Sequence, residues 1–201
     1  MTVRMSWDER FAREEYVYGK KPNAFLVRQM AELAPGSRVL VPGDGEGRNG
    51  VWLARQGMRV LSVDSSSVGL AKTRRLADDC GVAIETECAD LAAWEWPDSE
   101  FDAVVSIFLH LPPEVRSDIH AAMLKALKPG GRIILQAFRP EQVGYESGGP
   151  RTVSWLYTAT MLAADFAEAD ILINEVELVA LDEGPLHQGP AATIGVVARR
   201  R

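Results

Sequence analysis

The chain has 201 residues, of which 47% are hydrophobic and 25% charged, and its formal net charge at pH 7 is −6. This length predicts a single domain, residues 1–201, that buries roughly 70% of the surface of the unfolded chain. The negative charge argues against binding to nucleic acid or to an anionic membrane, because both require a basic face. No apolar run approaches the roughly 20 residues that span a bilayer, and no signal peptide precedes the two cysteines. We therefore expect a cytoplasmic protein with reduced thiols, and the sequence leaves the oligomeric state open.

Two helices are expected before the first strand. Ser6 and Glu9 have the spacing of a capping box, in which each side chain accepts a hydrogen bond from the other residue's backbone N–H, so a helix is predicted from Ser6 to about Tyr16. A second helix is predicted over Ala24–Leu33. The predicted units are a helical cap, residues 1–34, and an α/β core, residues 35–201.

A Gly-rich turn after the first predicted strand organises the rest of the chain. The apolar run Arg38–Val41 is typical of a short buried strand, and it breaks into a turn with glycines at alternate positions, Gly43, Gly45 and Gly47. A helical pattern follows the turn. A strand, a Gly-rich turn and a helix in this order bring backbone N–H groups against a nucleotide-like ligand.

The spacing of the glycines indicates which kind of ligand this turn suits. It is G-x-G-x-G, whereas a dinucleotide fold has G-x-G-x-x-G with a small last residue for close helix–strand packing. That last position is occupied here by the long side chain of Arg48. The pattern counts against a pyrophosphate ligand and favours the related turn of enzymes that use S-adenosylmethionine (SAM).

Strands and helices alternate up to residue 138, which predicts a mainly parallel sheet with right-handed crossovers. The strands expected in this part are Arg38–Val41, Met58–Val63, Val82–Thr86, Phe101–Phe108 and Arg132–Phe138. A helix is then predicted over Val153–Ala169, and two strands, Ile171–Leu181 and Ala191–Ala198, follow without a helix between them, so they are antiparallel. The predicted fold class is α/β, a three-layer Rossmann-like sandwich.

Two acids follow strands at the sheet edge where ligands of open α/β sheets bind. Asp64 comes 21 residues after Gly43, the distance at which a carboxylate accepts hydrogen bonds from ribose hydroxyls. Its alternative role is a helix N-cap, which Ser65 or Ser66 also fits. Asp90, with Leu91 beside it, is a candidate for the adenine end of the ligand or, alternatively, a solvated loop acid.

In combination these motifs resemble the class I SAM-dependent methyltransferases. The segments that carry the resemblance are Val39–Asn49, Asp64, Ala89–Leu91, Phe101–Leu111 and Leu127–Gly131. Further segments resemble the small bacterial group of tellurite-resistance and thiopurine methyltransferases: Trp7–Phe11, Tyr18-Gly19 with Pro22-Asn23, Gly45–Asn49 and His110–Pro112. The family fold is a seven-stranded, mostly parallel sheet with an antiparallel last strand, which agrees with the elements expected above.

The resemblance implies SAM as the cofactor and a set of residues around it. It places the three glycines at the methionine moiety, Asp64 at the ribose, and Asp90-Leu91 at the adenine. The full set expected at the cofactor is Trp7, Tyr18, Gly43, Asp44, Gly45, Glu46, Gly47, Arg48, Asn49, Asp64, Ser65, Ala89, Asp90, Leu91 and Phe108. No metal site is expected.

The sequence departs from the family pattern at one position. Many members end the first strand with an acid that helps hold the amino-acid end of the cofactor, and this chain has Val41 there. Our hypothesis is that Asp44 or Glu46 assumes this acidic role. Arg48 is a candidate partner for the methionine carboxylate.

Four residues are candidates for the acceptor side: His110, Arg139, Tyr145 and His187. Methyl transfer from a sulfonium needs mainly alignment, and it needs a base only for a hydroxyl or a protonated amine. Either histidine is such a base or else a hydrogen-bonded structural residue. Arg139 and Tyr145 lie in a Gly-rich segment that is a candidate lid and suits a small, polar or anionic acceptor.

Two other functional classes fit parts of the sequence. A nicotinamide-dependent oxidoreductase shares the strand, turn and helix, but Arg48 and the terminal hairpin oppose it. A protein that binds SAM or S-adenosylhomocysteine without catalysis would keep the glycines and the two acids. Release of S-adenosylhomocysteine in the presence of an acceptor separates this second class from a methyltransferase.

Overall fold

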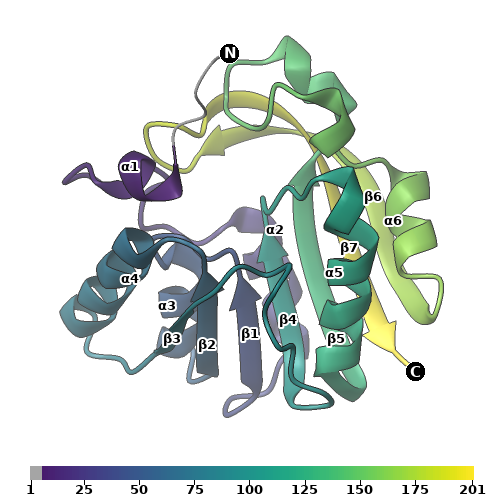
Figure 1. Cartoon of the computed structure of the whole chain (residues 1–201), viewed down its shortest axis with the longest axis horizontal. Helices are drawn as coiled ribbons and strands as arrows, with labels where there is room; N and C mark the ends of the chain where they lie inside the picture. The colour runs from purple at the N-terminus through teal and green to yellow at the C-terminus, as the bar shows by residue number, and fades with distance from the viewer. Residues whose placement is uncertain (1–5) are drawn as a thin grey trace.

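The computed structural model describes residues 6–201, so the first five residues of the predicted cap lie outside the described part of the chain. A seven-stranded sheet, in the order β3-β2-β1-β4-β5-β7-β6, forms the middle layer (Figure 1). Its strands are β1 (Arg38–Pro42), β2 (Arg59–Asp64), β3 (Glu85–Cys88), β4 (Phe101–Ile107), β5 (Leu127–Phe138), β6 (Ala169–Asp182) and β7 (Gln188–Arg200).

The last strand in sequence runs against the others. β1, β2, β3, β4 and β5 pair in parallel, whereas β7 lies between β5 and β6 and pairs antiparallel with both. Consequently β6 runs parallel to the first five strands, and the turn that joins it to β7 emerges at their carboxyl ends. The expected mostly parallel, seven-stranded sheet with an antiparallel last strand is confirmed.

Helices cover both faces of the sheet. They are α1 (Trp7–Phe11), α2 (Ala24–Gln29), α3 (Arg48–Arg55), α4 (Ser67–Asp79), α5 (Pro113–Ala126) and α6 (Ala159–Asp165), with short 3₁₀ helices η1 (Met30–Glu32), η2 (Pro140–Gly144) and η3 (Val153–Trp155). Phe25 of α2 and Leu53 of α3 belong to the core on one face, and Met123 of α5 and Phe166 after α6 belong to the core on the other. No helix within residues 6–201 is long and apolar enough to cross a membrane.

The first predicted helix is shorter than expected. The capping box of Ser6 and Glu9 is present, but the helix ends at Phe11. The reason is a tertiary contact, because the ammonium group of Lys72 in α4 takes up backbone carbonyls that a longer helix would use internally. It donates to the carbonyl oxygens of Phe11, Arg13 and Glu15 at 3.4, 2.8 and 2.7 Å.

Several further elements differ from the predicted ranges. The second helix ends at Gln29 and continues as η1, β5 begins at Leu127 rather than Arg132, and β6 and β7 extend beyond the predicted ends. The helix expected over Val153–Ala169 is divided into η3 and α6, because the backbone of Tyr157 is extended toward β5 and Thr158 caps a new helix through Met161 N–H. β3 begins at Glu85 rather than Val82, whose N–H closes α4 by donating to the carbonyl oxygen of Ala77.

Candidate active site

The Gly-rich turn joins β1 to α3 with its three glycines at positive φ: Gly43 at +69°, Gly45 at +61° and Gly47 at +85°. Neighbouring side chains also leave no room for a Cβ at the first two. A Cβ on Gly43 would lie 2.8 Å from Cδ1 of Leu109, and one on Gly45 would lie 3.0 Å from Cζ of Phe11. The glycines therefore let the side chains of Leu109 and Phe11 pack closely against the backbone of the turn.

Asp64 ends β2 beside this turn, and backbone N–H groups orient its carboxylate. Gly45 donates its N–H to Oδ2 and Ser66 donates its N–H to Oδ1, both at 2.8 Å. Helix α4 is capped by the Ser66 hydroxyl, so Asp64 is not the N-cap. Burial raises the pKa of Asp64. Each carboxylate oxygen has a second lone pair, so the fixed carboxylate still has acceptor capacity for two hydroxyl groups.

The end of β3 lies next to Asp64. Ala89 donates its N–H to the carbonyl oxygen of Asp64 at 3.0 Å, which brings Asp90 and Leu91 to the same edge of the sheet. Asp90 is exposed and Leu91 is buried. This arrangement suits the adenine, because Asp90 can accept from its amino group while Leu91 packs against its ring. Ser65, which follows Asp64, is exposed. The residues expected at ribose and adenine are thus neighbours in space.

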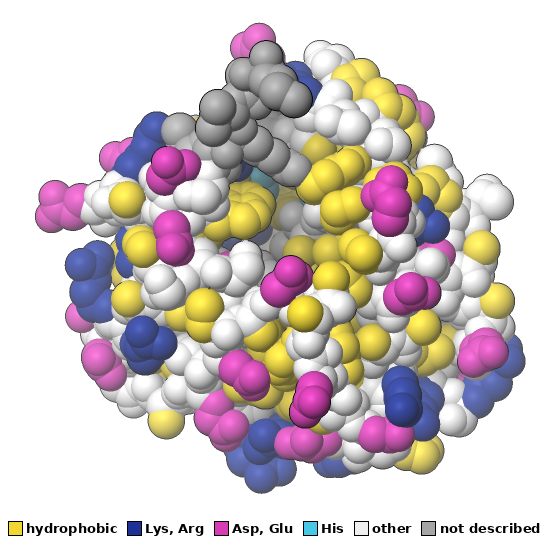
Figure 2. Space-filling view, in the orientation of Figure 1, with side chains coloured by type: hydrophobic (Ala, Val, Ile, Leu, Met, Phe, Trp, Pro, Cys, Tyr) yellow, Lys and Arg dark blue, Asp and Glu magenta, His cyan; other side chains and the backbone are white. Residues whose placement is uncertain are grey.

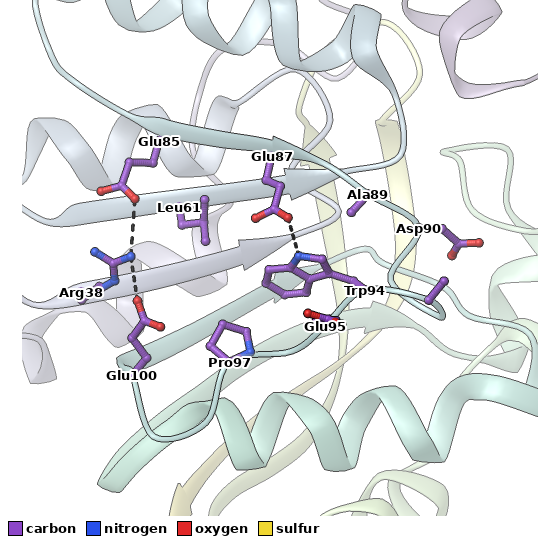
Figure 3. A pocket seen from close by; sticks show the side chains of 11 residues that line it. Arg38, Leu61, Glu85, Glu87, Ala89, Asp90, Trp94, Glu95, Pro97 and Glu100 are labelled. Carbon is purple, nitrogen blue, oxygen red and sulfur yellow. Dashed lines mark hydrogen bonds and ion pairs between the residues drawn. The ribbon is translucent and has the colours of Figure 1, made fainter.

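A depression of about 580 Å³ lies next to this edge, over β3, β2 and β1 (Figure 3). It reaches Ala89 and Asp90 but includes neither Asp64 nor the Gly-rich turn. In its lining, Arg38 forms ion pairs with Glu85 and Glu100 at 3.4 and 2.8 Å, and Trp94 donates to the carboxylate of Glu87 at 2.7 Å. The depression therefore adjoins the candidate site at its adenine end.

Phe108 follows β4 with a φ of +54°, an unusual conformation for a residue other than glycine. Its ring stacks on Phe138 with the centroids 4.3 Å apart, and the ring of His187 meets its edge at 5.0 Å. His187 also contacts the ring of Tyr18 at 4.5 Å. Four rings thus form one aromatic cluster. Tyr18 comes from the N-terminal segment (residues 6–23), Phe108 follows β4, Phe138 ends β5, and His187 lies in the connection of the β6–β7 hairpin (residues 183–187).

The N-terminal segment and the hairpin cross above the sheet, where Figure 1 shows the hairpin reaching toward α1. Leu186 of the hairpin donates its N–H to the carbonyl oxygen of Val17 at 3.0 Å. Trp7 stacks on Phe11 with the ring centroids 5.5 Å apart, and Trp7 remains 46% exposed. Figure 2 shows hydrophobic side chains on both sides of a hollow in this face of the molecule.

The two carboxylates proposed to hold the amino-acid end of the cofactor have other partners. Asp44 is buried and accepts hydrogen bonds from the Ser62 hydroxyl at 2.5 Å and from Gly50 N–H at 3.2 Å, and burial raises its pKa to about 6. Glu46 forms an ion pair with Lys72 at 2.5 Å and accepts the N–H of Tyr18 at 3.3 Å. These contacts are structural, so the geometry argues against the hypothesis for both residues.

Arg48, at the start of α3, is also paired within the protein. Its Nη1 lies 2.8 Å from Oε2 of Glu183 in the hairpin, and both side chains are buried. The neighbouring Asn49 accepts the N–H of Asn23 at 2.9 Å, and the Asn23 amide donates to Glu183 Oε1 at 3.0 Å. The turn, the N-terminal segment and the hairpin are therefore connected by one buried polar network.

His110 has hydrogen-bond partners on both ring nitrogens. Its Nδ1 lies 2.9 Å from the carbonyl oxygen of Trp155, and Nε2 accepts the N–H of Phe138 at 3.2 Å. The proton therefore resides on Nδ1, and burial lowers the pKa of His110 to about 4. Because no nitrogen is left for a substrate, the geometry favours the structural alternative for His110.

Arg139 and Tyr145 lie in the segment after β5, which is fastened to β7. The buried amide of Gln142 accepts Ala192 N–H at 2.8 Å and donates to Ser147 and Gly148. Arg139 Nη1 donates to Glu141 at 3.0 Å, while its buried Nε has no hydrogen-bond partner within residues 6–201. Tyr145 is half-buried.

Phe11 and Asn23 lie in segments that carry the resemblance, but sequence reasoning did not assign them to the site, and it missed Lys72 and Glu183 altogether. Spacing along the chain carries no information about the first three, because their partners are distant in sequence. Glu183 had one local signal, since it precedes His187 by four residues in a short hairpin connection.

Residues 39–131 match the family model described as a methyltransferase domain. The chain is 29% identical over 167 residues to a thiopurine S-methyltransferase of Nitrosospira multiformis, covering 74% of this chain and 76% of that enzyme. It is 33% identical over 144 residues to the thiopurine S-methyltransferase of Azotobacter vinelandii, covering 62% and 66%. The solved structure of TehB from Haemophilus influenzae superposes with a TM-score of 0.73 at 20% identity, covering 89% of this chain and 62% of that one.

The fold, the Gly-rich turn and these matches define the class: the chain is a class I SAM-dependent methyltransferase. It is similar in sequence to the bacterial thiopurine S-methyltransferases and similar in fold to TehB. The residues present fit the cofactor, since the three glycines add no side chain to the turn and Asp64 retains acceptor capacity for a diol.

Proposed function

We propose that the chain methylates a small polar or anionic acceptor, with His187 as proton acceptor or orienting donor and Arg139 as charge partner. The observation that carries this proposal is the position of His187. The hairpin holds its ring against Phe108 at the end of β4 and against Tyr18 of the N-terminal segment. This is the edge of the sheet at which Gly43, Gly45, Gly47 and Asp64 fit the cofactor.

The aromatic cluster favours a small acceptor over a macromolecule. His187 is 5% exposed and Phe138 is fully buried, so only a compact group reaches the cluster. Aromatic walls contribute apolar contact and exclude water, while a few polar groups fix the orientation of the ligand.

The cations near the cluster suit a negative or strongly polar group. Arg10 donates to the Tyr18 hydroxyl at 2.9 Å, beside His187. Arg139 has a buried Nε without a hydrogen-bond partner among residues 6–201, and its side chain is 24% exposed. An acceptor anion would supply the missing partner, and Glu141, which now pairs with Arg139, is exposed and easily displaced.

Bound SAM supplies a methyl group on a positively charged sulfur. The protein's residues then have to align the acceptor for in-line attack, exclude water and, where the nucleophile is protonated, remove its proton. For a thiolate, alignment by the aromatic cluster and Arg139 suffices. For a hydroxyl or an amine, His187 takes the proton, because both nitrogens of His110 are already engaged.

A screen of acceptors for release of S-adenosylhomocysteine tests the proposal. The screen includes thiopurines, which the relatives' names indicate, together with small thiols, selenite, tellurite and amines. On the acceptor found, His187→Ala and Arg139→Ala are expected to lower kcat by tenfold or more while the affinity for S-adenosylhomocysteine stays within about twofold. Arg151→Ala, in the same segment, is the matched control, and full activity in both test variants would overturn the assignment.

A further inference from the structure

We propose that Glu183 and Gly148 together give His187 one fixed orientation: Glu183 faces Nδ1, and Gly148 leaves Nε2 open to the acceptor. The effect of this orientation on catalysis rests on the proposed function. The orientation of the His187 ring itself does not depend on any substrate. Glu183 is a positioning residue in this scheme and does not touch the acceptor.

The hairpin connection brings Glu183 and His187 together. Glu183 donates its N–H to the carbonyl oxygen of His187, and His187 donates its N–H to the carbonyl oxygen of Gly184, both at 3.0 Å. These two backbone hydrogen bonds form a tight turn that carries both side chains into the same buried region. Oε2 of Glu183 lies 3.7 Å from Nδ1 of His187.

The Glu183 carboxylate is itself held from two sides. Asn23 donates to Oε1 at 3.0 Å, and Arg48 lies 2.8 Å from Oε2. Asn23 in turn donates to Gln136 of β5 at 2.7 Å, so the carboxylate is tied to the sheet. A carboxylate held in this way orients the N–H group that faces it, which here is Nδ1–H of His187.

Nδ1 of His187 is buried and has no hydrogen-bond partner within residues 6–201, and Glu183 Oε2 is the acceptor it faces. A separation of 3.7 Å is too long for a hydrogen bond, but contacts of this kind are commonly long without ligand and shorten in the reacting complex. A neutral histidine with its proton on Nδ1, toward the carboxylate, has its free lone pair on Nε2.

Gly148 borders the other side of the ring. It has a φ of +115°, and a Cβ there would lie 2.5 Å from Cδ2 and 2.9 Å from Nε2 of His187. A side chain at this position would be strained and would cover the nitrogen that has to accept the proton. The glycine therefore keeps Nε2 open.

Burial and two nearby arginines keep His187 neutral. Burial is the main cause that lowers its pKa, and Arg48 and Arg10 lower it further, whereas Glu183 raises it. His110, which stacks on Phe138, adds no charge because it is neutral near pH 7. A neutral imidazole is the form that accepts a proton.

The orientation is tested directly by nitrogen-15 NMR of the imidazole rings, because the chain has only three histidines to assign. In the wild type we expect His187 to carry its proton on Nδ1. In Glu183→Gln we expect a lower pKa for His187 and a mixture of the two tautomers. Asp182→Asn removes the neighbouring exposed carboxylate and should leave both properties unchanged.

A proton on Nε2 in the wild type, or an unchanged His187 signal in Glu183→Gln, would overturn the inference. Both readouts need no acceptor, so they stand even if the screen finds none or if His187→Ala stays active. Those two results would count against the proposed function alone.

The activities of two further variants test the role of Gly148. They also test the proposal if Glu183→Gln does not fold. Gly148→Ala is expected to lower kcat by tenfold or more and to shift the His187 signals, since its Cβ meets the ring. Gly144→Ala lies in the same segment, where a Cβ would meet nothing within 4 Å, and should keep normal kcat. Equal activity and unchanged His187 signals in the two variants would contradict the proposal.

Discussion

Lys72 of α4 forms an ion pair with Glu46 of the Gly-rich turn, and the same ammonium group donates to three carbonyl oxygens of the N-terminal segment. One buried charge thus joins the turn, α4 and the segment that covers them. We expect Lys72→Met to release the segment, because Glu46 is left as an uncompensated buried charge, at a cost of roughly 3–5 kcal/mol. Faster amide hydrogen exchange over residues 7–19 and weaker binding of S-adenosylhomocysteine would report this release.

Lys125→Met is the control for the Lys72 variant, since the ammonium group of Lys125 forms an exposed ion pair with Asp98 at 3.5 Å. The double variant Glu46→Gln with Lys72→Met should recover part of the stability, because Glu46 no longer leaves an unpaired buried charge. It should not restore slow exchange, because the hydrogen bonds from Lys72 to the three carbonyl oxygens are still missing. Unchanged exchange and unchanged affinity in Lys72→Met would refute the coupling.

Asp64 is expected to carry much of the cofactor affinity. In Asp64→Ala the carboxylate that Gly45 and Ser66 orient is gone, and with it two charge-assisted hydrogen bonds to the ribose, on the order of 2–4 kcal/mol. Calorimetric titration with S-adenosylhomocysteine measures the loss. Asp79→Asn, at the exposed far end of α4, is the matched control, and equal affinity in Asp64→Ala and Asp79→Asn would disprove the ribose assignment.

A second acid, whose side chain is 5% exposed, is expected to stabilise the fold away from the site. Asp165 accepts hydrogen bonds from Arg116 at 2.8 Å and pairs with His120 at 2.7 Å, and these two partners hold its pKa down to about 2 against the effect of burial. A lowered pKa means that the stabilisation, about 2 kcal/mol, is present above pH 4 and is lost as the pH falls toward 2.

Asp165→Asn should therefore lower the free energy of unfolding at pH 7 by at least this amount, while cofactor affinity stays normal. Urea denaturation at several pH values measures it. In the wild type the free energy of unfolding should fall steeply between pH 4 and pH 2 because Asp165 becomes protonated, and in the variant this fall should be absent. A variant as stable as the wild type at pH 7 would show that the cluster contributes nothing.

The sheet and the position of Asp64 were predictable because they depend on local patterns. Apolar runs of strand length and the distance from Gly43 to Asp64 are properties of the sequence itself. The antiparallel hairpin was also predictable, because no helix fits between its strands. The first helix was predicted too long because its end is set by Lys72, a tertiary contact that periodicity does not report.

The polar interior of the site was not predictable. Arg48 faces Glu183 only because the hairpin folds back over the N-terminal segment, and no spacing in the sequence relates the two residues. The roles of His110 and His187 illustrate the same limit. Both were expected at the same edge, and only the contacts of their ring nitrogens distinguish the engaged histidine from the one with an open Nε2.

Asp44 is expected to make the protein less stable as the pH rises through the range from 4 to 6. Burial raises its pKa to about 6, above the ordinary value of 3.8, so folding favours the protonated form. The stabilisation is complete below pH 4 and is lost as the pH passes 6, a change of about 3 kcal/mol for roughly two pH units. Asp165 acts with the opposite sign, but only below pH 4.

Asp44→Asn should remove this dependence and raise the free energy of unfolding at pH 7.5 by up to about 3 kcal/mol. The amide keeps both contacts, because its oxygen accepts from Gly50 N–H and its nitrogen donates to the Ser62 hydroxyl, while no charge has to be buried. Urea denaturation of both proteins between pH 4 and pH 8 measures the difference. If the free energy of unfolding has the same pH dependence in the two proteins, ionisation of Asp44 does not destabilise the fold.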